Sequence, residues 1–360
     1  MRRSPFIREL TTLGHADRPL VGGKAASLGM LLAAGCPVPP GFALTTEAYR
    51  YFLERNGLTG LFEFVQDEGM RSDDAAAQLS RRVEEAFLAA TLPEDLADEL
   101  AESYLELGKE IGQPEPVVAV RSSAADEDSR TASFAGQHET YLGIQGIDSL
   151  FRAVRRCWAS AYTPRAIAYR VHRGLSLTDA AVGVVVQLLV EPRAAGVLFT
   201  LSPRTGDRSL IVIEGSWGLG QAVVGGEVTP DEYVVSKVTL ELVRKKVNPK
   251  PFRYRRGAWD GSLVREELPP ELAGAPCLAE SEMIELARRA RELEKRLGYP
   301  LDVEWAMCDQ PERGTVFFLQ CRPETVWTTK ERPLATLAAS NPIMAIAQTL
   351  VRSPSRPGNG

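Results

Sequence analysis

Two short segments near the end of the sequence carry side chains suited to hold a metal ion and a phosphate. Residues Leu301–Met307 and Thr315–Arg322 alternate in polarity as β-strands do, and the short loop 308–314 between them permits antiparallel pairing. A period of two then places four polar side chains on one surface, namely Asp302, Glu304, Gln320 and Arg322. The spacing therefore predicts a hairpin with a carboxylate, an amide and a guanidinium close together.

This set of side chains has two interpretations. Mg²⁺ takes oxygen ligands from one or two carboxylates and from nucleotide phosphates, so Glu304 can supply a carboxylate oxygen and Gln320 an amide oxygen. Arg322 can neutralise charge that develops on a transferred phosphoryl group. A cross-strand ion pair on an exposed sheet fits the same pattern, and spacing alone does not decide between them.

A second candidate site lies around Arg121. Val117–Val120 predicts a short buried strand that ends in the polar turn 121–123, and the small-residue loop 133–137 precedes an extended segment at Thr140–Ile144. An arginine fork can hold two phosphate oxygens, and small residues let backbone N–H groups approach them. These features are typical of a phosphate clamp, although a surface or ion-paired arginine would explain Arg121 alone.

Two further polar residues are candidates. Gly22-Gly23-Lys24 opens a predicted helix that runs to Ala34, and a helix N-terminus attracts anions. The spacing is not that of a Walker A motif, and a solvated lysine is the simpler explanation of Lys24 on its own. Gln187 interrupts the apolar strand 182–190, so its amide needs either a backbone partner or a ligand such as the edge of adenine or a ribose.

The remaining elements predict a mixed α and β protein. Helices are expected at 46–56, 74–90 and 94–111, a long helix with an aromatic core stripe at 147–173, and another helix at 281–296. The glycine-rich turn 215–220 lacks the dinucleotide spacing G-x-G-x-x-G, which argues against a Rossmann site.

Bulk properties limit the function classes. The net charge of −5 and the pI near 5.5 argue against a broad nucleic-acid surface. No apolar run approaches the roughly 20 residues that span a bilayer, and the first ten residues lack the apolar core of a signal peptide. The five cysteines show no paired metal-binding spacing, so we expect a cytoplasmic protein with ordinary thiols.

Four motifs in the same order resemble one protein family. The sequence RSSAADEDS…SFAGQHETYLGI closely resembles the ATP-binding region of phosphoenolpyruvate synthase, pyruvate phosphate dikinase and rifampicin phosphotransferase. The resemblance covers roughly residues 7–330 and includes GGKAASLGMLLAAGCPVPPGFALTTEAY, GSWGLGQAVVGGEVTPDEYVV and LDVEWAM…FFLQCRPETVW.

The resemblance implies an α+β fold of ATP-grasp type, with the nucleotide bound between two lobes. The first lobe would be residues 1–180 with a helical insert at about 46–111, the second would be 181–330, and 331–360 would be a partly disordered tail. One departure is Gln221, where most relatives carry a glutamate, and this puts any charge-dependent role of that position in doubt.

The resemblance also assigns roles to residues. It implies ATP with Mg²⁺ or Mn²⁺ as cofactors, metal ligands at Glu304 and Gln320, and catalytic roles for Lys24, Arg121 and Arg322. The nucleotide-binding set that it implies is Lys24, Arg121, Gly136, Thr140, Gln187, Glu304, Gln320 and Arg322.

Full-length relatives relay phosphate through a histidine on a separate domain. His15, His138 and His172 all lack the Thr-Cys-His context of that histidine. The resemblance therefore implies a dikinase subunit that transfers phosphate from Mg-ATP to a histidine on a partner polypeptide and releases AMP. This arrangement is similar to the smaller subunit of phenylphosphate synthase, and phenol, pyruvate or another hydroxyl compound would be the final acceptor.

Two alternatives remain open. The chain would otherwise be a fragment of a single-chain phosphoenolpyruvate synthase or rifampicin phosphotransferase, or a non-catalytic ATP-sensing module. The joint presence of metal-binding and transfer residues argues against a sensor, which would need neither.

Overall fold

The computed structural model describes residues 5–66, 73–124, 139–178, 180, 182–257, 262–309 and 316–327. The chain divides into two compact units, residues 1–323 and 324–360, so the division falls seven residues before the predicted boundary at 330. In the described part of the second unit, the Glu324 carboxylate accepts hydrogen bonds from the backbone N–H groups of Val326 and Trp327. The expected tail 331–360 lies outside the described residues.

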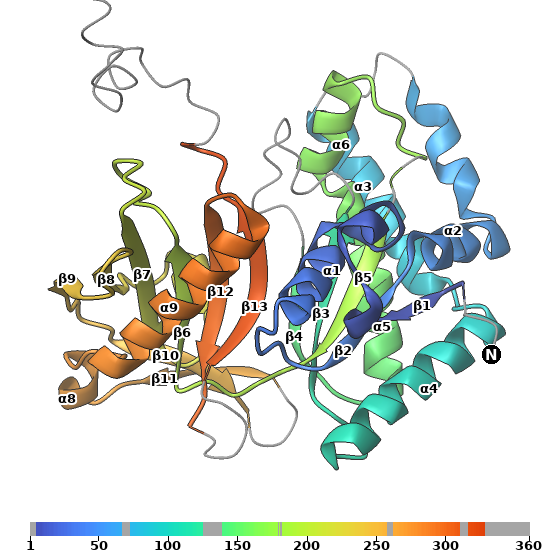
Figure 1. Ribbon diagram of the computed structural model, residues 1–360. Helices are drawn as coiled ribbons and strands as arrows, with labels where there is room; N and C mark the ends of the chain where they lie inside the picture. Colours follow the sequence, from blue (N-terminus) through green and yellow to red (C-terminus); the bar gives the residue numbers. More distant parts are fainter. Residues whose placement is uncertain are drawn as a thin grey trace, which may run out of the picture. The chain divides into compact units, whose positions relative to one another are not determined.

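The first sheet has the strand order β1-β2-β5-β3-β4, and each neighbouring pair is antiparallel (Figure 1). Its strands are β1 (Ile7–Glu9), β2 (Gly41–Leu44), β3 (Val118–Ala124), β4 (Thr140–Ile144) and β5 (Val182–Leu188). Strand β5 lies between β2 and β3, so residues 182–188, which were assigned to the second predicted lobe, belong to the first sheet. Valine-rich β5 is a central strand, and its composition suits burial on both faces.

Helices surround this sheet. They are α1 (Arg18–Ala33), α2 (Thr46–Arg55), α3 (Asp73–Ala89), α4 (Glu94–Ile111), α5 (Ile147–Ala159) and α6 (Pro164–His172). The predicted helices at 46–56, 74–90 and 94–111 are confirmed within a residue at each end. The long helix predicted at 147–173 is instead broken by a 3₁₀ turn at Ser160–Tyr162, because Pro164 begins a new helix that Thr163 caps.

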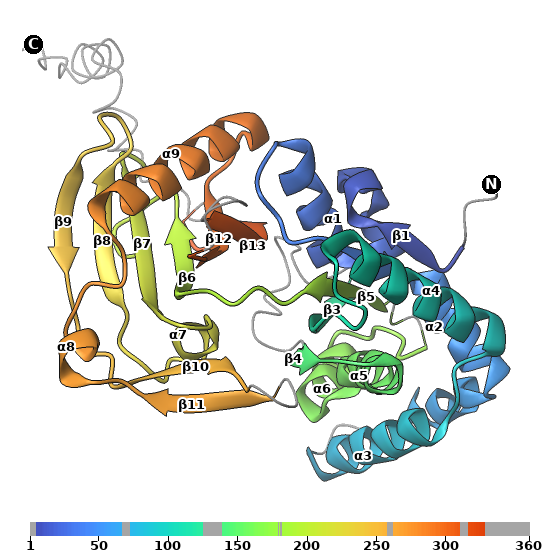
Figure 2. The ribbon, with the colours of Figure 1, turned by 90° about the horizontal axis from the view of Figure 1, so that it is seen from below.

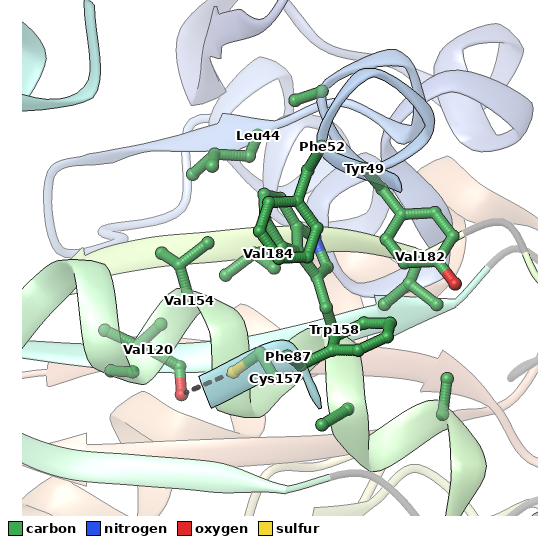
Figure 3. Packing of buried hydrophobic residues seen from close by; sticks show 14 of the residues in the cluster. Leu44, Tyr49, Phe52, Phe87, Val120, Val154, Cys157, Trp158, Val182 and Val184 are labelled. Atoms are coloured by element: carbon green, nitrogen blue, oxygen red, sulfur yellow. Dashed lines mark hydrogen bonds between the residues drawn. The ribbon is translucent and has the colours of Figure 1, made fainter. Parts of the chain in front are cut away.

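The aromatic stripe lies in the first core, as predicted. Trp158 and Tyr162 are fully buried, and Trp158 packs on Tyr49 and Phe52 from α2, as Figure 3 shows for the rings of Trp158, Tyr49 and Phe52. In the same core the Cys157 thiol lies 3.6 Å from the carbonyl oxygen of Val120 on β3, so α5 packs directly on the central strands.

The second sheet has the order β13-β12-β6-β7-β8-β9, again with antiparallel neighbours. Its strands are β6 (Ala194–Phe199), β7 (Leu210–Trp217), β8 (Asp231–Ser236), β9 (Leu242–Lys246), β12 (Leu301–Met307) and β13 (Val316–Pro323). A separate ribbon joins β10 (Phe252–Arg256) to β11 (Leu263–Glu267). Short helices α7 (Gln221–Val224) and α8 (Pro270–Ala273) and the longer α9 (Glu280–Leu297) complete this part.

Helix α9 covers one face of the second sheet (Figure 2). Its buried Met283 and Leu286 share a core with Val303 and Trp305 of β12. Alternation along β12 therefore leaves the opposite face to polar side chains. Helix α1 belongs to the same core through Leu28 and other residues, so this core continues from the second sheet to a helix that also packs on the first sheet.

Candidate functional site

The polar face of the second sheet carries the predicted hairpin. Strands β12 and β13 pair antiparallel, with Glu304 opposite Gln320 and Asp302 opposite Arg322, so the predicted convergence of these four side chains is confirmed. Directly opposed residues of neighbouring strands project to the same face. This face is therefore the surface on which a carboxylate, an amide and a guanidinium meet.

Asp302 and Arg322 form the cross-strand ion pair that the spacing allowed. The Arg322 guanidinium donates to the Asp302 carboxylate with an N–O distance of 2.8 Å from Nε and 2.6 Å from Nη2. The Arg322 side chain remains 42% exposed. The pairing holds the guanidinium on the polar face of the sheet, where part of the side chain is accessible.

Arg121 of the first sheet reaches this hairpin. Its Nη2 donates to the Glu304 carboxylate at 2.9 Å and to Gln320 Oε1 at 2.7 Å, and its Nη1 donates to the Leu319 carbonyl at 2.9 Å. The residue is buried, and its Nε has no hydrogen-bond partner among the described residues. The structure thus brings Arg121, Glu304 and Gln320 into direct contact.

The local setting of Arg121 differs from the prediction. Residues 121–123 were expected in a turn, but β3 continues through Ala124, and Arg121 pairs with Val185 of β5 and Thr140 of β4. The strand continues because its polar side chains find partners in the interior; the Ser123 hydroxyl, for example, accepts a hydrogen bond from the backbone N–H of Ala25 at 3.2 Å.

A β-bulge shapes the other side of this contact. Glu304 pairs with Gln320 and the next residue, Trp305, pairs with Phe318, so Leu319 is one extra residue in β13. Its carbonyl is the one that Arg121 binds. Bulges occur next to active sites, where they redirect side chains. Here the extra residue lets Phe318 and Cys321 both face the core while Gln320 faces the polar side.

Lys24 lies beside the same strand. Helix α1 is kinked at Gly22, which has a left-handed φ of 81°, and its main part continues through Lys24. Lys24 is buried, and its Nζ donates to the carbonyl of Ser122 at 3.1 Å, so the solvated lysine is excluded. A Cβ at position 22 would overlap the backbone of Ser123. Glycine is therefore required for α1 to approach β3 and place Lys24 next to Arg121.

The other predicted site residues are less close to this cluster. Thr140 is exposed at the start of β4 and lies opposite Arg121 in the register. Gln187 is buried in β5, and its Nε2 donates to the Pro39 carbonyl at 3.1 Å, which is the backbone partner that the sequence left open. Gly136 lies outside the described residues. Gln221 is exposed at the start of α7.

Sequence reasoning missed two residues near the site. Glu214 of β7 shares a cross-sheet row with Glu304, separated only by Val197, and burial raises the pKa of its carboxyl. A single carboxylate directly after the apolar run 210–213 was the available signal. Ser27 donates from α1 to the carbonyl of Cys321 in β13. It follows Lys24 by three residues, so helical spacing could have shown that the two share a face.

The cluster provides a suitable donor set for a hard cation. Glu304 and Gln320 present a carboxylate oxygen and an amide oxygen on neighbouring strands, and Mg²⁺ commonly takes one or two such ligands together with nucleotide phosphates. The Nε of Arg121, which has no hydrogen-bond partner in the part of the chain that the structure describes, adds a buried donor for an anion. In the described ranges, no group of three or more His, Cys, Asp or Glu side chains is placed to hold a metal.

Comparisons with known proteins show the family of the chain. Residues 18–340 match the family model described as pyruvate phosphate dikinase, AMP/ATP-binding domain. The chain is 40% identical to a probable phosphoenolpyruvate synthase of Staphylothermus marinus, over 99% of this chain and 46% of the relative. It is 41% identical to a probable phosphoenolpyruvate synthase of Methanothermobacter thermautotrophicus (89% and 46%) and 37% identical to the phosphoenolpyruvate synthase of Aeropyrum pernix (94% and 45%).

These relatives are longer proteins. The chain spans about half the length of each of the three. Among the helices of the described residues, none combines the length and the apolar character needed to cross a membrane.

Proposed function

Because this chain belongs to the family of the pyruvate phosphate dikinase AMP/ATP-binding domain, we propose that it binds Mg-ATP and transfers phosphate from it to a histidine on a partner polypeptide. The fold would act as an ATP-grasp, with the nucleotide held between residues of the two sheets. Lys24 and Arg121 would bind phosphate oxygens, and Glu304 and Gln320 would hold the cation. Arg322 would neutralise charge on the transferring group.

The contact of Arg121 with Glu304 and Gln320 carries this proposal. These residues are separated by 183 and 199 positions in the chain and come from different sheets, yet the guanidinium lies within 2.9 Å of both side chains. The guanidinium proposed to bind phosphate oxygens and the two side chains proposed to bind the metal are therefore within hydrogen-bond distance of each other. This arrangement supports the proposal because it suits phosphates of ATP that are bridged by a metal ion.

We propose that the acceptor histidine belongs to the partner polypeptide. His15 and His172 are exposed and lie outside the Arg121 cluster, and His138 is not among the described residues. In the proposed scheme a histidine nitrogen of the partner attacks the β-phosphorus of ATP, and AMP is the leaving group. Water then releases the γ-phosphate as inorganic phosphate, so that the β-phosphate remains on the histidine. The curated relatives are named phosphoenolpyruvate synthases, which supports pyruvate as the acceptor to test before phenol.

The test uses ATP labelled separately in the β and γ positions. The purified chain is incubated with each label and Mg²⁺, with and without desalted extract of its source, and compared with the Arg121→Met variant. We expect AMP and acid-labile β-label on a second polypeptide, neither of which the variant should form. Adding pyruvate or phenol should then discharge the label from the partner to only one of them.

Other results would refute parts of the scheme. ADP formation without labelled protein would indicate a direct kinase, and β-label on this chain itself would show that no partner carries the histidine. ATP binding without any turnover under all conditions would favour the ATP-sensing module. Fast ATP hydrolysis by the isolated chain would also contradict the relay, because cleavage of ATP should require the acceptor histidine of the partner.

A further inference from the structure

We infer that Ser27 is a positioning residue that holds β13, and with it Gln320 and Arg322, in place for the β- and γ-phosphates of ATP. This inference rests on the proposed function, because it concerns the same site. Ser27 is buried in α1, and its hydroxyl donates to the main-chain carbonyl of Cys321. Cys321 lies directly between Gln320 and Arg322, so the bond fixes the backbone from which both side chains project.

The position of β13 at the sheet edge explains why this bond matters. An edge strand presents backbone groups that no neighbouring strand can satisfy. On β13 these groups bind the first lobe instead. The Leu319 carbonyl accepts from Arg121, the Phe318 N–H donates to the Pro37 carbonyl at 2.8 Å, and the Cys321 carbonyl accepts from Ser27.

Among these three contacts, that of Ser27 can be removed without removing a proposed ligand. Arg121 is assigned to phosphate, and the Pro37 contact is made by the backbone, which a side-chain substitution leaves in place. The Ser27 hydroxyl contacts a carbonyl and is assigned no contact with the nucleotide. Loss of this hydroxyl should therefore shift the positions of Gln320 and Arg322 and leave both side chains chemically unaltered.

Helix α1 connects the two halves of the site through this residue. On one side, Lys24 Nζ donates to the Ser122 carbonyl and the Ala25 N–H donates to the Ser123 hydroxyl, both on β3 next to Arg121. On the other side, Ser27 bonds to β13. The helix thus sets the distance between the residues of the first sheet and those of the second, and a shift of about 1 Å is enough to disturb such a site.

The inference predicts a selective loss of affinity. Gln320 and Arg322 are assigned to the metal and to the transferred phosphate, and AMP lacks the β- and γ-phosphates. Removing the Ser27 hydroxyl should therefore weaken Mg-ATP binding and leave AMP binding almost unchanged. A serine that served only packing would affect both nucleotides alike, so the ratio of the two affinities distinguishes positioning from stability.

The experiment is titration calorimetry of the full chain with Mg-ATP and with AMP. We expect Ser27→Ala to weaken Mg-ATP about tenfold and AMP less than twofold. Ser160→Ala is the matched control, since Ser160 is also buried and donates to a backbone carbonyl, that of Cys157, at 2.7 Å, but within the first core. This control should alter neither affinity. Ser27→Cys, which keeps the volume and a weak donor, should give a smaller loss of Mg-ATP affinity.

The outcomes separate the inference from the proposed function. If the unaltered chain fails to bind Mg-ATP, the proposed function fails and the inference falls with it. If the chain binds Mg-ATP and Ser27→Ala binds it equally well, or loses affinity for ATP and AMP in parallel, the inference alone is overturned. If Ser27→Ala does not fold, Ser27→Cys decides, and an unchanged ratio of the two affinities would overturn the inference.

Discussion

Replacing Glu304 by glutamine should have opposite effects on ATP binding with and without Mg²⁺. The substitution keeps the shape of the side chain and an oxygen acceptor but removes its charge. In the structure the Glu304 carboxylate lies 2.9 Å from Arg121 Nη2, and the two side chains are only 28% and 11% exposed. Glu304 therefore neutralises the guanidinium that is proposed to bind phosphate.

The size of the effect follows from the geometry of this pair. Two unit charges about 4 Å apart interact by about 4 kcal/mol at an effective dielectric constant of about 20. Glu304 is partly open to solvent, so we expect about half of this value, ~2 kcal/mol, to be felt at Arg121. Without metal, Glu304→Gln should then bind ATP about 30-fold more tightly, since 1.4 kcal/mol corresponds to about a factor of ten.

With Mg²⁺ present, Glu304→Gln should instead weaken the binding of ATP. The variant lacks the carboxylate that is proposed to hold the cation, and an amide oxygen is a weaker ligand for a hard ion. We expect at least about a tenfold loss of Mg-ATP affinity, or ~1.4 kcal/mol. In the unaltered chain, the Arg121–Glu304 pair would thus make nucleotide binding and metal binding depend on each other. Each ligand would offset the cost of separating Arg121 from Glu304.

The assay is calorimetric titration of ATP in excess chelator and in excess Mg²⁺. Glu282→Gln is a matched control, because Glu282 pairs with Arg193 at 2.5 Å with similar exposure, 23% and 25%, away from the site. This variant should leave both affinities unchanged. If Glu304→Gln binds metal-free ATP no more tightly than the unaltered chain, or if both affinities change in the same direction, the proposed opposition between Arg121 and Glu304 is refuted.

Three further predictions concern the fold around the site. Gly22→Ala should lower the free energy of unfolding by more than about 2 kcal/mol in urea denaturation, since its Cβ would overlap β3 and its φ is 81°, whereas Gly14→Ala, where a Cβ meets nothing within 4 Å, should have little effect. Lys250→Met should lower the free energy of unfolding by about 3–5 kcal/mol in the same assay, because it leaves the fully buried Asp231, 2.6 Å from Lys250 Nζ, without its cation. A change under about 1 kcal/mol would contradict this. Burial raises the pKa of Glu214 above 4.5, so the folded chain holds this proton more tightly than the unfolded chain, and the free energy of unfolding should fall as pH rises above about 4.5. Glu214→Gln should reduce that fall in denaturation series between pH 4.5 and 7. An unchanged dependence of the free energy of unfolding on pH would show that Glu214 does not titrate in this way.

The hairpin of the site could be predicted because its signals are local. A period of two along 301–307 and a short loop define which residues share a face, and the register confirms this for Glu304 and Gln320. The extent of β3 could not be read in the same way. Arg121 and the two serines after it suggest a turn by composition, yet they remain in a strand because partners distant in the chain satisfy them.

Long-range pairing also explains the other differences. The place of β5 in the first sheet depends on its pairing with β2 and β3, and its own apolar composition would suit a central strand of either sheet. The contact between Arg121 and Glu304 joins residues that are 183 positions apart. The break at Pro164 was a local signal that the aromatic stripe concealed, because Trp158 and Tyr162 keep helical spacing up to the residues just before it.

The core shared by α1 and the second sheet limits how this chain could be rearranged. Leu28 and Leu31 of α1 lie in one cluster with Val316 and Phe318 of β13, although more than 280 residues separate them. A cut in the segment between β5 and β6 would divide this cluster and leave apolar side chains of each fragment facing water. We therefore expect the two sheets to be inherited together rather than exchanged as separate modules, and fragments that end near residue 190 to be poorly soluble.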